Sequence, residues 1–560
     1  MTGWKEGKES DVMSHIPPLT HHPSPIAFFC ILLLVCFSAP PIEANSLINL
    51  PLNDEVSDFS AEAYAFIYRF LNKRVLPGIT RGSLPLTRGE VATLLLDLYE
   101  KHANSEIALS QVDQERLNTL MHLFADELPR DLSPSRPRLH IAQLKSDNYH
   151  FAFDLAVSQR AISRHSNTSL MEGTAHITTL LPHVHGQVRD DFAFSTDIGY
   201  HFLYGELFGD LFPDEASYTH FDGDLQNKVP VDAYLTFKLP WFELEIGQDN
   251  LHWGPGYHGA LLISKTPISM DMIKMQASYK HLRFSAFTGI LEDTDHGIDD
   301  QYLSGHRIEV YLWNRFGFGL SEVVVYGNRF EPSYLNPVNV YLIDMVTTER
   351  ADARATGTGD NILVSVDSRF RIADNLEIYG ELMIDDGNPS KDFHHWDTKF
   401  GILGGIYATD PFGISNTDLH VEYAFINQYA YTHENPANVY RHFSSVIGHH
   451  IGPDADNLWV ELRHRFTGKL ETVLIYEQER HGEGNIDKPH PLDAPKDDQW
   501  TPLSGITQSE HSMTLGTNYT AIGRYSIVAD FTRFWLHNIG NRTEVDDTRT
   551  EVKLKALYRF

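Results

Sequence analysis

The sequence predicts an all-β transmembrane barrel of antiparallel strands, about 18 in number, preceded by a small α-helical periplasmic domain. Three observations lead to this fold class: a short apolar segment near the N-terminus, long runs of period two from residue 139 onward, and a C-terminal strand ending in an aromatic residue. The predicted boundaries are a signal peptide at 1–44, a helical domain with its linker at 45–138, and the barrel at 139–560.

The C-terminal strand, residues 550–560, has one apolar and one polar face. A period of two places alternate side chains on opposite sides of a strand, so one face meets an apolar environment and the other meets water or polar groups. A terminal Phe is typical of bacterial outer-membrane barrels, although an edge strand of a soluble sandwich would show the same alternation. The apolar face holds Val552, Leu554, Ala556, Tyr558 and Phe560, and the polar face holds Glu551, Lys553, Lys555 and Arg559.

The N-terminal segment 26–37 is an unbroken apolar run of twelve residues. This length suits the apolar region of a signal peptide and is too short for a transmembrane helix. Cleavage is predicted after Ala44, and the prolines on both sides of the run disfavour a buried core helix. The two cysteines, Cys30 and Cys36, both lie inside the run, so the mature chain is predicted to contain no disulfide.

The formal net charge of −30 makes the protein a poor candidate for nucleic acid binding, which needs a basic face, and no later segment offers eighteen consecutive apolar residues. We therefore expect no nucleic acid partner. The acidic residues are expected in loops and in the barrel lumen, where they repel anions and attract cations.

Residues 55–130 show helical rather than strand periodicity. Apolar residues recur at helical spacing in three stretches, 64–71, 91–98 and 117–128, which predicts three short helices around a shared core. Thr87 and Glu90 have the spacing of a capping box at the start of the second helix. The domain could serve as a periplasmic plug or docking domain, or only as a packing appendage. Prolines at 129, 134 and 137 indicate a linker.

From about residue 139 the period changes to two and stays there. The clearest runs lie at 192–204, 376–385 and 419–431, and each alternates apolar with polar or acidic residues. The first and last are as long as a membrane strand, which needs roughly 9–11 residues. Unpaired carboxylates would be costly in a dry sandwich core, so the acidic inner face favours a wet lumen.

A distinctive turn follows a strand that ends near Asn250. Trp253, Gly254, Pro255 and Gly256 form a tight turn that is followed by Tyr257. Such a turn can fold into the lumen, present aromatic faces and leave glycine N–H groups exposed, which suits sugar rings. The alternative is that Trp253 is only a girdle or core aromatic.

This segment, with Leu261, Leu262 and Ser264 after it, closely resembles the outer-membrane capsule-assembly family of the Wzi type. Further matching blocks make the resemblance extend over about 55–560. Gln248 stands where we would expect Arg, and Lys265-Thr266 stands where an Asn-rich pair is usual, so the glycan could differ. The candidate structural or ligand-binding residues are Trp253, Gly254, Pro255, Gly256, Tyr257, Asn336, Asp360, Asn361, Glu381, Asp385 and Asp386.

The resemblance implies an outer-membrane barrel that attaches exported capsular or extracellular polysaccharide to the cell surface in a lectin-like way. It implies no catalysis and no cofactor. The expected partners are outer-membrane lipid, the surface polysaccharide and the barrel assembly machinery, with the protein as a monomer. The main alternative is a porin-like solute channel; a glycan-modifying enzyme is the third class considered.

The acidic candidates allow two other interpretations. Glu381, Asp385 and Asp386 could form a Ca²⁺ site, since clustered carboxylates suit that ion. A pair such as Glu381 and Asp385 could hydrolyse glycosidic bonds if the carboxyl separation were right. We favour charges neutralised by arginine and water over both, and predict neither a metal site nor an enzyme.

Overall fold

A computed structural model describes residues 46–52, 58–129, 140–168, 172–207, 218–220, 226–228, 231–265, 269–293, 298–327, 329–341, 359–385, 395–491, 495, 498–521 and 524–560. All of them belong to one compact unit, Pro41–Phe560. The predicted signal peptide, most of the predicted linker and Asp386 lie outside the described residues.

Among the described residues, three helices precede the barrel strands: α2 (Asp58–Asn72), α3 (Arg88–Ala103) and α4 (Gln111–Leu123). The predicted capping box is present at the start of α3, where the Thr87 side chain accepts from the Glu90 N–H and the Glu90 carboxylate accepts from the Thr87 N–H. The third helix ends earlier than the apolar stripe, at Leu123, because Phe124 caps it. Phe124 and Leu128 remain buried in the shared core of the three helices.

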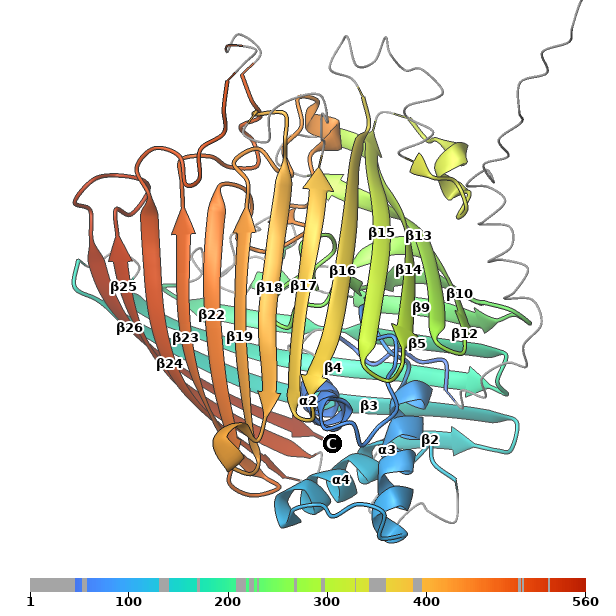
Figure 1. Cartoon of the computed structure of the whole chain (residues 1–560). Coiled ribbons are helices and arrows are strands. Elements are labelled where there is room, and N and C mark those ends of the chain that lie inside the picture. Colours follow the sequence, from blue (N-terminus) through green and yellow to red (C-terminus); the bar gives the residue numbers. More distant parts are fainter. Residues whose placement is uncertain are drawn as a thin grey trace, which may run out of the picture. The chain divides into compact units, whose positions relative to one another are not determined.

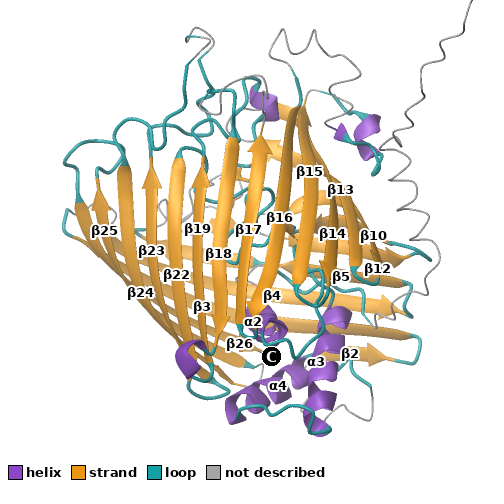
Figure 2. Ribbon diagram, in the orientation of Figure 1, coloured by secondary structure: helices purple, strands orange, loops and turns teal. Residues whose placement is uncertain are grey.

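The barrel strands are β3 (Tyr149–Ser166), β4 (Gly173–Val188), β5 (Phe192–Ile198), β6 (Tyr200–Gly205), β8 (Gln226–Lys228), β9 (Val231–Lys238), β10 (Glu243–Asp249), β12 (Met270–Tyr279), β13 (Leu282–Asp293), β14 (Ile298–Leu312), β15 (Phe316–Gly327), β16 (Asn361–Ala373), β17 (Leu376–Asp385), β18 (Phe400–Thr409), β19 (Thr417–Ile426), β22 (Ala455–Arg465), β23 (Leu470–His481), β24 (Gln508–Ala521), β25 (Tyr525–His537) and β26 (Asp547–Arg559). Each pairs antiparallel with its neighbours, and the β26–β3 pairing closes the ring (Figures 1 and 2).

Two of these strands are interrupted. β5 and β6 count as one strand because both pair with β4, and β8 and β9 count as one because they pair with β6 and β5. The described residues therefore form a closed antiparallel barrel of 18 strands, as the sequence predicts. Short accessory strands are β1 (Ser83–Leu84), β2 (Ala142–Lys145), β7 (Tyr218–His220), β11 (His252–Trp253), β20 (Arg441–His442) and β21 (Ser445–Val446).

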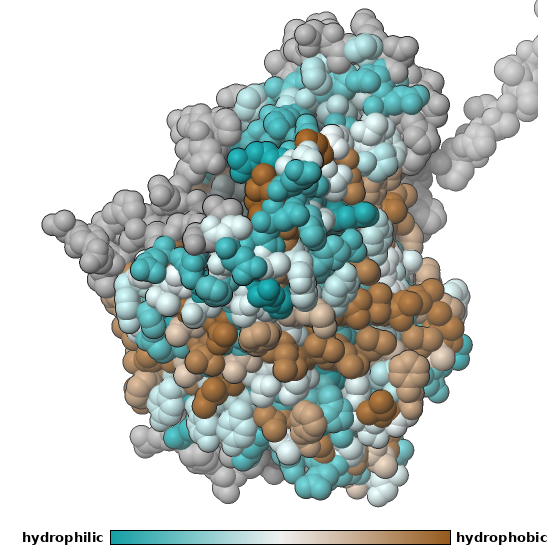
Figure 3. Space-filling model, turned by 90° about the vertical axis from the view of Figure 1, so that its left-hand side faces the viewer, coloured by the Kyte–Doolittle hydropathy of each residue, from teal (hydrophilic) through white to brown (hydrophobic). Residues whose placement is uncertain are grey.

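In each strand that alternates apolar with polar residues, the apolar side chains lie on the outer face of the barrel. Val552, Leu554 and Tyr558 of β26 are 40%, 51% and 43% exposed, whereas Glu551 on the inner face is 1% exposed. Ile378, Leu382 and similar residues on other strands are also exposed, and Figure 3 shows an apolar band below hydrophilic loops. This pattern is that of a lipid-facing surface.

No helix among the described residues is long and apolar enough to cross a membrane. The two ends of the barrel differ in their connections. Tight turns such as 280–281 and 374–375 lie at the end that carries the helices and the C-terminus, and longer connections such as 427–454 lie at the other end (Figure 1). Short periplasmic turns and long extracellular loops are typical of outer-membrane barrels.

Candidate functional site

The connection from β10 to β12 enters the barrel. We call residues 250–265 the inner loop. β11, at its start, pairs with β1 from the N-terminal region, and Trp253 also forms an isolated bridge with Ile263. The inner loop is thus held by a small sheet of its own, with one strand supplied by the helical region.

Trp253 is 2% exposed and belongs to the largest buried apolar cluster. Its ring meets the ring of Phe287 edge-on, with centroids 5.2 Å apart. Phe287 lies on the same face of β13 as Arg283. This face points into the barrel, because the Arg283 guanidinium donates to the Ser83 carbonyl in the N-terminal region. Trp253 therefore points inward, and its ring packs in the core instead of offering a free face to a sugar.

The glycines of the turn are needed for close approach. Gly254 has a φ of +150°, and a Cβ there would lie 2.7 Å from the Ala260 side chain. A Cβ on Gly256 would lie 1.7 Å from the carbonyl oxygen of Gly259. The expectation of exposed glycine amides is wrong for Gly254, whose N–H donates to the Gly82 carbonyl at 3.0 Å.

Glu422 on β19 is the main acceptor for the rest of the turn. Its carboxylate accepts from the N–H groups of Tyr257, His258 and Gly259 at 2.8, 3.2 and 3.1 Å, and from the Tyr379 hydroxyl at 2.7 Å. Sequence reasoning did not select Glu422. Its alternation placed it on the inner face of a strand, but nothing in the sequence linked it to a turn some 160 residues earlier.

Tyr257 lies in an aromatic cluster. Its ring centroid is 5.8 Å from that of Tyr68 in α2, 5.4 Å from Tyr379, 5.2 Å from Tyr407 and 4.6 Å from His420. Burial raises the pKa of the Tyr257 hydroxyl, so it stays protonated. The neighbouring Pro255 is also buried. The predicted turn therefore acts as an anchor between the helices and the far wall of the barrel.

Glu381 and Asp385 on β17 hold loops in place. Glu381 accepts from the Leu261 and Leu262 N–H groups at 2.9 and 3.2 Å and from the Ser365 hydroxyl at 2.8 Å. Asp385 is fully buried and accepts from the Tyr431 N–H. Both carboxylates thus serve as acceptors for backbone amides, and the cation and hydrolase interpretations gain no support from these contacts.

The remaining candidates lie away from the inner loop, around the connection from β15 to β16. Asp360 accepts from the Arg329 guanidinium at 2.6 Å and from the Tyr334 hydroxyl at 2.7 Å. Asn361 is 1% exposed and donates to the Asn438 carbonyl at 3.0 Å, whereas Asn336 is exposed. The sequence candidates therefore form two groups: one inside the barrel, and one that joins the outer loops.

Arginines of the helical region reach carboxylates on the barrel wall. Arg69 is 1% exposed and pairs with Asp418 of β19 at 2.6 Å. Arg81 pairs with Glu377 of β17, and Arg116 pairs with Glu471 of β23. One pair has the opposite sense, with Glu90 of α3 bound to Arg283 of β13. The expectation of a wet acidic inner face is therefore wrong on this side of the barrel, where the carboxylates are buried and paired.

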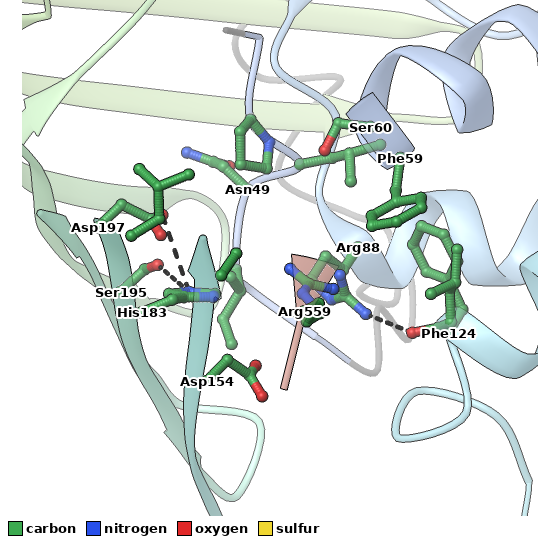
Figure 4. A pocket seen from close by; sticks show the side chains of 16 residues that line it. Asn49, Phe59, Ser60, Arg88, Phe124, Asp154, His183, Ser195, Asp197 and Arg559 are labelled. Atoms are coloured by element: carbon green, nitrogen blue, oxygen red, sulfur yellow. Dashed lines mark hydrogen bonds and ion pairs between the residues drawn. The ribbon is translucent and has the colours of Figure 1, made fainter. Parts of the chain in front are cut away.

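A small cavity lies between the helices and strands β3 to β5 (Figure 4). Arg88, Asp154, His183 and Arg559 are among the residues that line it. Its volume of about 50 Å³ holds a few water molecules but no sugar ring. This is a small polar cavity between the helical region and the barrel, not a glycan site.

The family model for the capsule assembly protein Wzi matches residues 161–527. The chain belongs to the Wzi family. Among solved structures it is similar to Escherichia coli Wzi, described as a carbohydrate-binding β-barrel involved in group 1 capsule assembly, with 13% identity, a TM-score of 0.56, and 91% of this chain and 99% of that chain covered. As a Wzi-family protein, it is an outer-membrane barrel.

Similarity to two Pseudomonas aeruginosa barrels is weaker. OccK5 matches with 10% identity and a TM-score of 0.40, covering 73% of this chain and 98% of that one. OprD matches with 11% identity and a TM-score of 0.42, covering 73% and 95%. No curated protein matches the sequence.

Two positions depart from the Wzi-type pattern expected from the sequence. Gln248, where Arg is expected, lies at the end of β10, and its side-chain amide is 3.4 Å from the Ser269 carbonyl. Lys265 is exposed at the end of the inner loop, and Thr266 lies outside the described residues. The mouth of this loop is therefore where the chain differs from the expected family pattern.

Proposed function

We propose that this Wzi-family barrel attaches an exported capsular or extracellular polysaccharide to the cell surface as a lectin, without catalysing a reaction. The observation that carries the proposal, beside the family match, is the path of the inner loop. It leaves β10 and is bound by Glu422 on β19, although seven strands, β12 to β18, lie between these two in the ring.

A loop that bridges strands so far apart in an 18-stranded ring crosses the lumen. His258 extends the crossing to β22, where its ring stacks on Trp459 at 4.9 Å and 8°. The crossing is also held by β1 and by Tyr68 of α2. A lumen bridged in this way suits a binding protein better than a high-flux pore.

The glycan is bound by the long loops at the end opposite the helices. Trp396 is half-buried there, and its ring stacks on that of His490 at 4.0 Å and 11°. Tyr429 meets His490 edge-on at 5.3 Å. Flat aromatic faces next to polar groups suit sugar rings, which present apolar C–H faces and polar rims.

The binding test compares a deletion strain with strains complemented by wild type, Trp396→Ala or Trp313→Ala. Trp313 is the matched control because it is 81% exposed in the β14–β15 turn, at the helical end. We expect the deletion to release glycan into the medium without stopping its synthesis. Trp396→Ala should release more glycan than Trp313→Ala. Unchanged glycan retention in the deletion strain would contradict the proposal.

The channel alternative is tested separately, by conductance of the purified protein in a planar bilayer. A bridged lumen predicts little steady current. Large, stable conductance together with unchanged glycan retention would favour a porin-like channel. The proposed partners also include the barrel assembly machinery, which would recognise the strand ending at Phe560, and we propose that the mature protein is a monomer.

A further inference from the structure

A cluster of histidines and aspartates lies where the helical region joins the first barrel strands. Asp126 follows α4, His140 precedes β2, Asp154 lies on β3 and His185 lies on β4. His140 is central: its Nδ1 atom is 2.8 Å from Asp154 Oδ1, and its Nε2 atom is 2.8 Å from Asp126 Oδ2. Four segments of the chain thus contribute polar groups to one point.

Two sets of possible metal ligands share His140. In each set the three ligand atoms lie within 4.8 Å of one another: Asp126, His140 and His150 in one, and His140, Asp154 and His185 in the other. The first set is already satisfied, since Lys145 pairs with Asp126 at 2.6 Å and the side-chain amide of Gln143 is 2.8 Å from His150 Nε2. The second set is the more buried of the two.

His185 supplies an independent observation. It is 7% exposed, and its Nδ1 atom has no hydrogen-bond partner among the described residues. Buried polar atoms are nearly always paired, and one that is not calls for an explanation such as an ion. Imidazole nitrogen is a preferred ligand of Zn²⁺ and of other divalent transition metals.

We propose that His140, Asp154 and His185 bind a single divalent transition-metal ion, with Zn²⁺ the best fit. Two imidazoles and a carboxylate are a common three-ligand set for Zn²⁺, which takes a water molecule in its fourth position. Asp154 lines the small cavity of Figure 4, which has room for that water. The ion would replace the proton now shared by His140 Nδ1 and Asp154.

Asp126 is the positioning residue of this site. With the metal on Nδ1, His140 Nε2–H donates to Asp126, which fixes the ring as in other carboxylate–histidine–metal arrangements. Tetrahedral bonds of about 2.0–2.2 Å separate ligand atoms by roughly 3.3–3.6 Å, so the 2.8 Å contact between His140 and Asp154 must widen slightly. The ion would link β3 and β4 to His140, which precedes β2. Through the hydrogen bond between His140 and Asp126, it would also link these strands to the helical region.

The test uses the full mature protein without a histidine tag, stripped with a chelator and titrated with Zn²⁺. Calorimetry and elemental analysis should give one ion per chain, and Co²⁺ substitution should give the intense visible bands of a tetrahedral site. His185→Gln and Asp154→Asn should weaken Zn²⁺ binding by at least about 100-fold, and Asp126→Asn by about 10–100-fold. The matched control His176→Gln, on the same strand and stacked on Tyr204, should bind as wild type.

Heat-modifiable mobility on gels shows which variants form the barrel. If a ligand variant does not fold, the wild-type stoichiometry, its Co²⁺ spectrum and the Asp126→Asn affinity decide the question. Absence of stoichiometric Zn²⁺ binding by the folded wild type would overturn the proposal. Equal binding by wild type and folded His185→Gln would overturn it too, and His140 would then be a proton-sharing bridge between two carboxylates.

Discussion

The inner surface of the barrel has two sides that differ in what covers them. On β15 to β17, which we call the packed wall, Val323, Leu363 and Met383 are completely buried against loops and against one another. On β23 to β26, the exposed wall, the inward side chains of Glu477 and Lys553 are 27% and 44% exposed. Both walls are formed by strands of the same closed antiparallel barrel.

The difference shows that strand pairing alone does not determine how far the inward side chains are covered. Both walls carry acidic inward residues. On the packed wall the helical arginines and inner-loop amides reach them, as at Glu377 and Glu381. On the exposed wall Arg116 reaches Glu471 at the helical end of β23, but Glu477 further along the same strand stays partly exposed. A buried carboxylate that is paired stays charged at tolerable cost, whereas an unpaired one does not. The packed wall is therefore a joint between barrel, helices and inner loop, and the exposed wall is the side left for solvent.

The largest expected effect comes from breaking the buried charge cluster that joins α2 to α4 and to the start of β19. Arg69→Met leaves the buried Asp113 without its ion-pair partner and removes one of the two arginines of Asp418, which keeps Arg465, so it should cost about 3 kcal/mol of unfolding free energy. Lys553→Met on the exposed wall should cost less than about 1 kcal/mol, because its pair with Glu551 is partly in water and Glu551 keeps Arg164. Equal costs in chemical unfolding would erase the distinction between charges buried under the helices and charges on the exposed wall.

The inner loop gives the next effect. Gly256→Val forces a side chain into the carbonyl of Gly259 and should destabilise the barrel by about 3 kcal/mol, with loss of heat-modifiable protein. Gly359→Val is the matched control, since a Cβ there meets nothing within 4 Å. Trp253→Phe keeps an aromatic ring beside Phe287 and should be milder. If it proved as damaging as Gly256→Val, close backbone approach would not be what the turn requires.

Acid should loosen the same joint. Asp410 lies in the β18–β19 turn; burial alone would raise the pKa of its carboxyl, but Arg69 and Lys73 outweigh burial and lower it. A lowered folded-state pKa means that the stabilisation is present above the unfolded value of about 3.9 and is lost as the pH falls below it. Unfolding measured from pH 6 to 3 should show the difference between wild type and Asp410→Asn shrinking below about pH 4. A constant difference would contradict this assignment.

The smallest equilibrium effect concerns the last residue. Phe560 is 53% exposed, and its N–H donates to the Leu155 carbonyl at 2.9 Å, so its deletion should change stability by no more than about 1 kcal/mol. Assembly in the outer membrane should nevertheless fall while export continues, since the terminal strand is the expected recognition signal. An unchanged yield of heat-modifiable barrel in cells would count against that role.

Local patterns in the sequence predicted the local structure. The alternation in 550–560 gave a strand with the correct lipid-facing residues, and Thr87 with Glu90 gave a capped helix, because each pattern is read within a few residues. What fills the lumen was not predictable in this way. The acceptor Glu422 and the His140 cluster depend on contacts between residues far apart in sequence, and no spacing rule carries that information.

The ring closes where β26 pairs with β3, and we call this pairing the seam. Its position decides when the barrel can close during synthesis of the chain. β26 pairs with β3, and β2 pairs with the next stretch of β3, so the first and last strand segments share one neighbour. A chain truncated before β26 leaves β3 and β25 with bare edges, and the ring stays open until the final residues arrive. The helical region comes first in the chain, so it can be enclosed as the strands curl round it, with no need to thread a finished ring. The barrel wall can therefore close only when the chain has been made as far as β26, because β26 supplies the partner of β3.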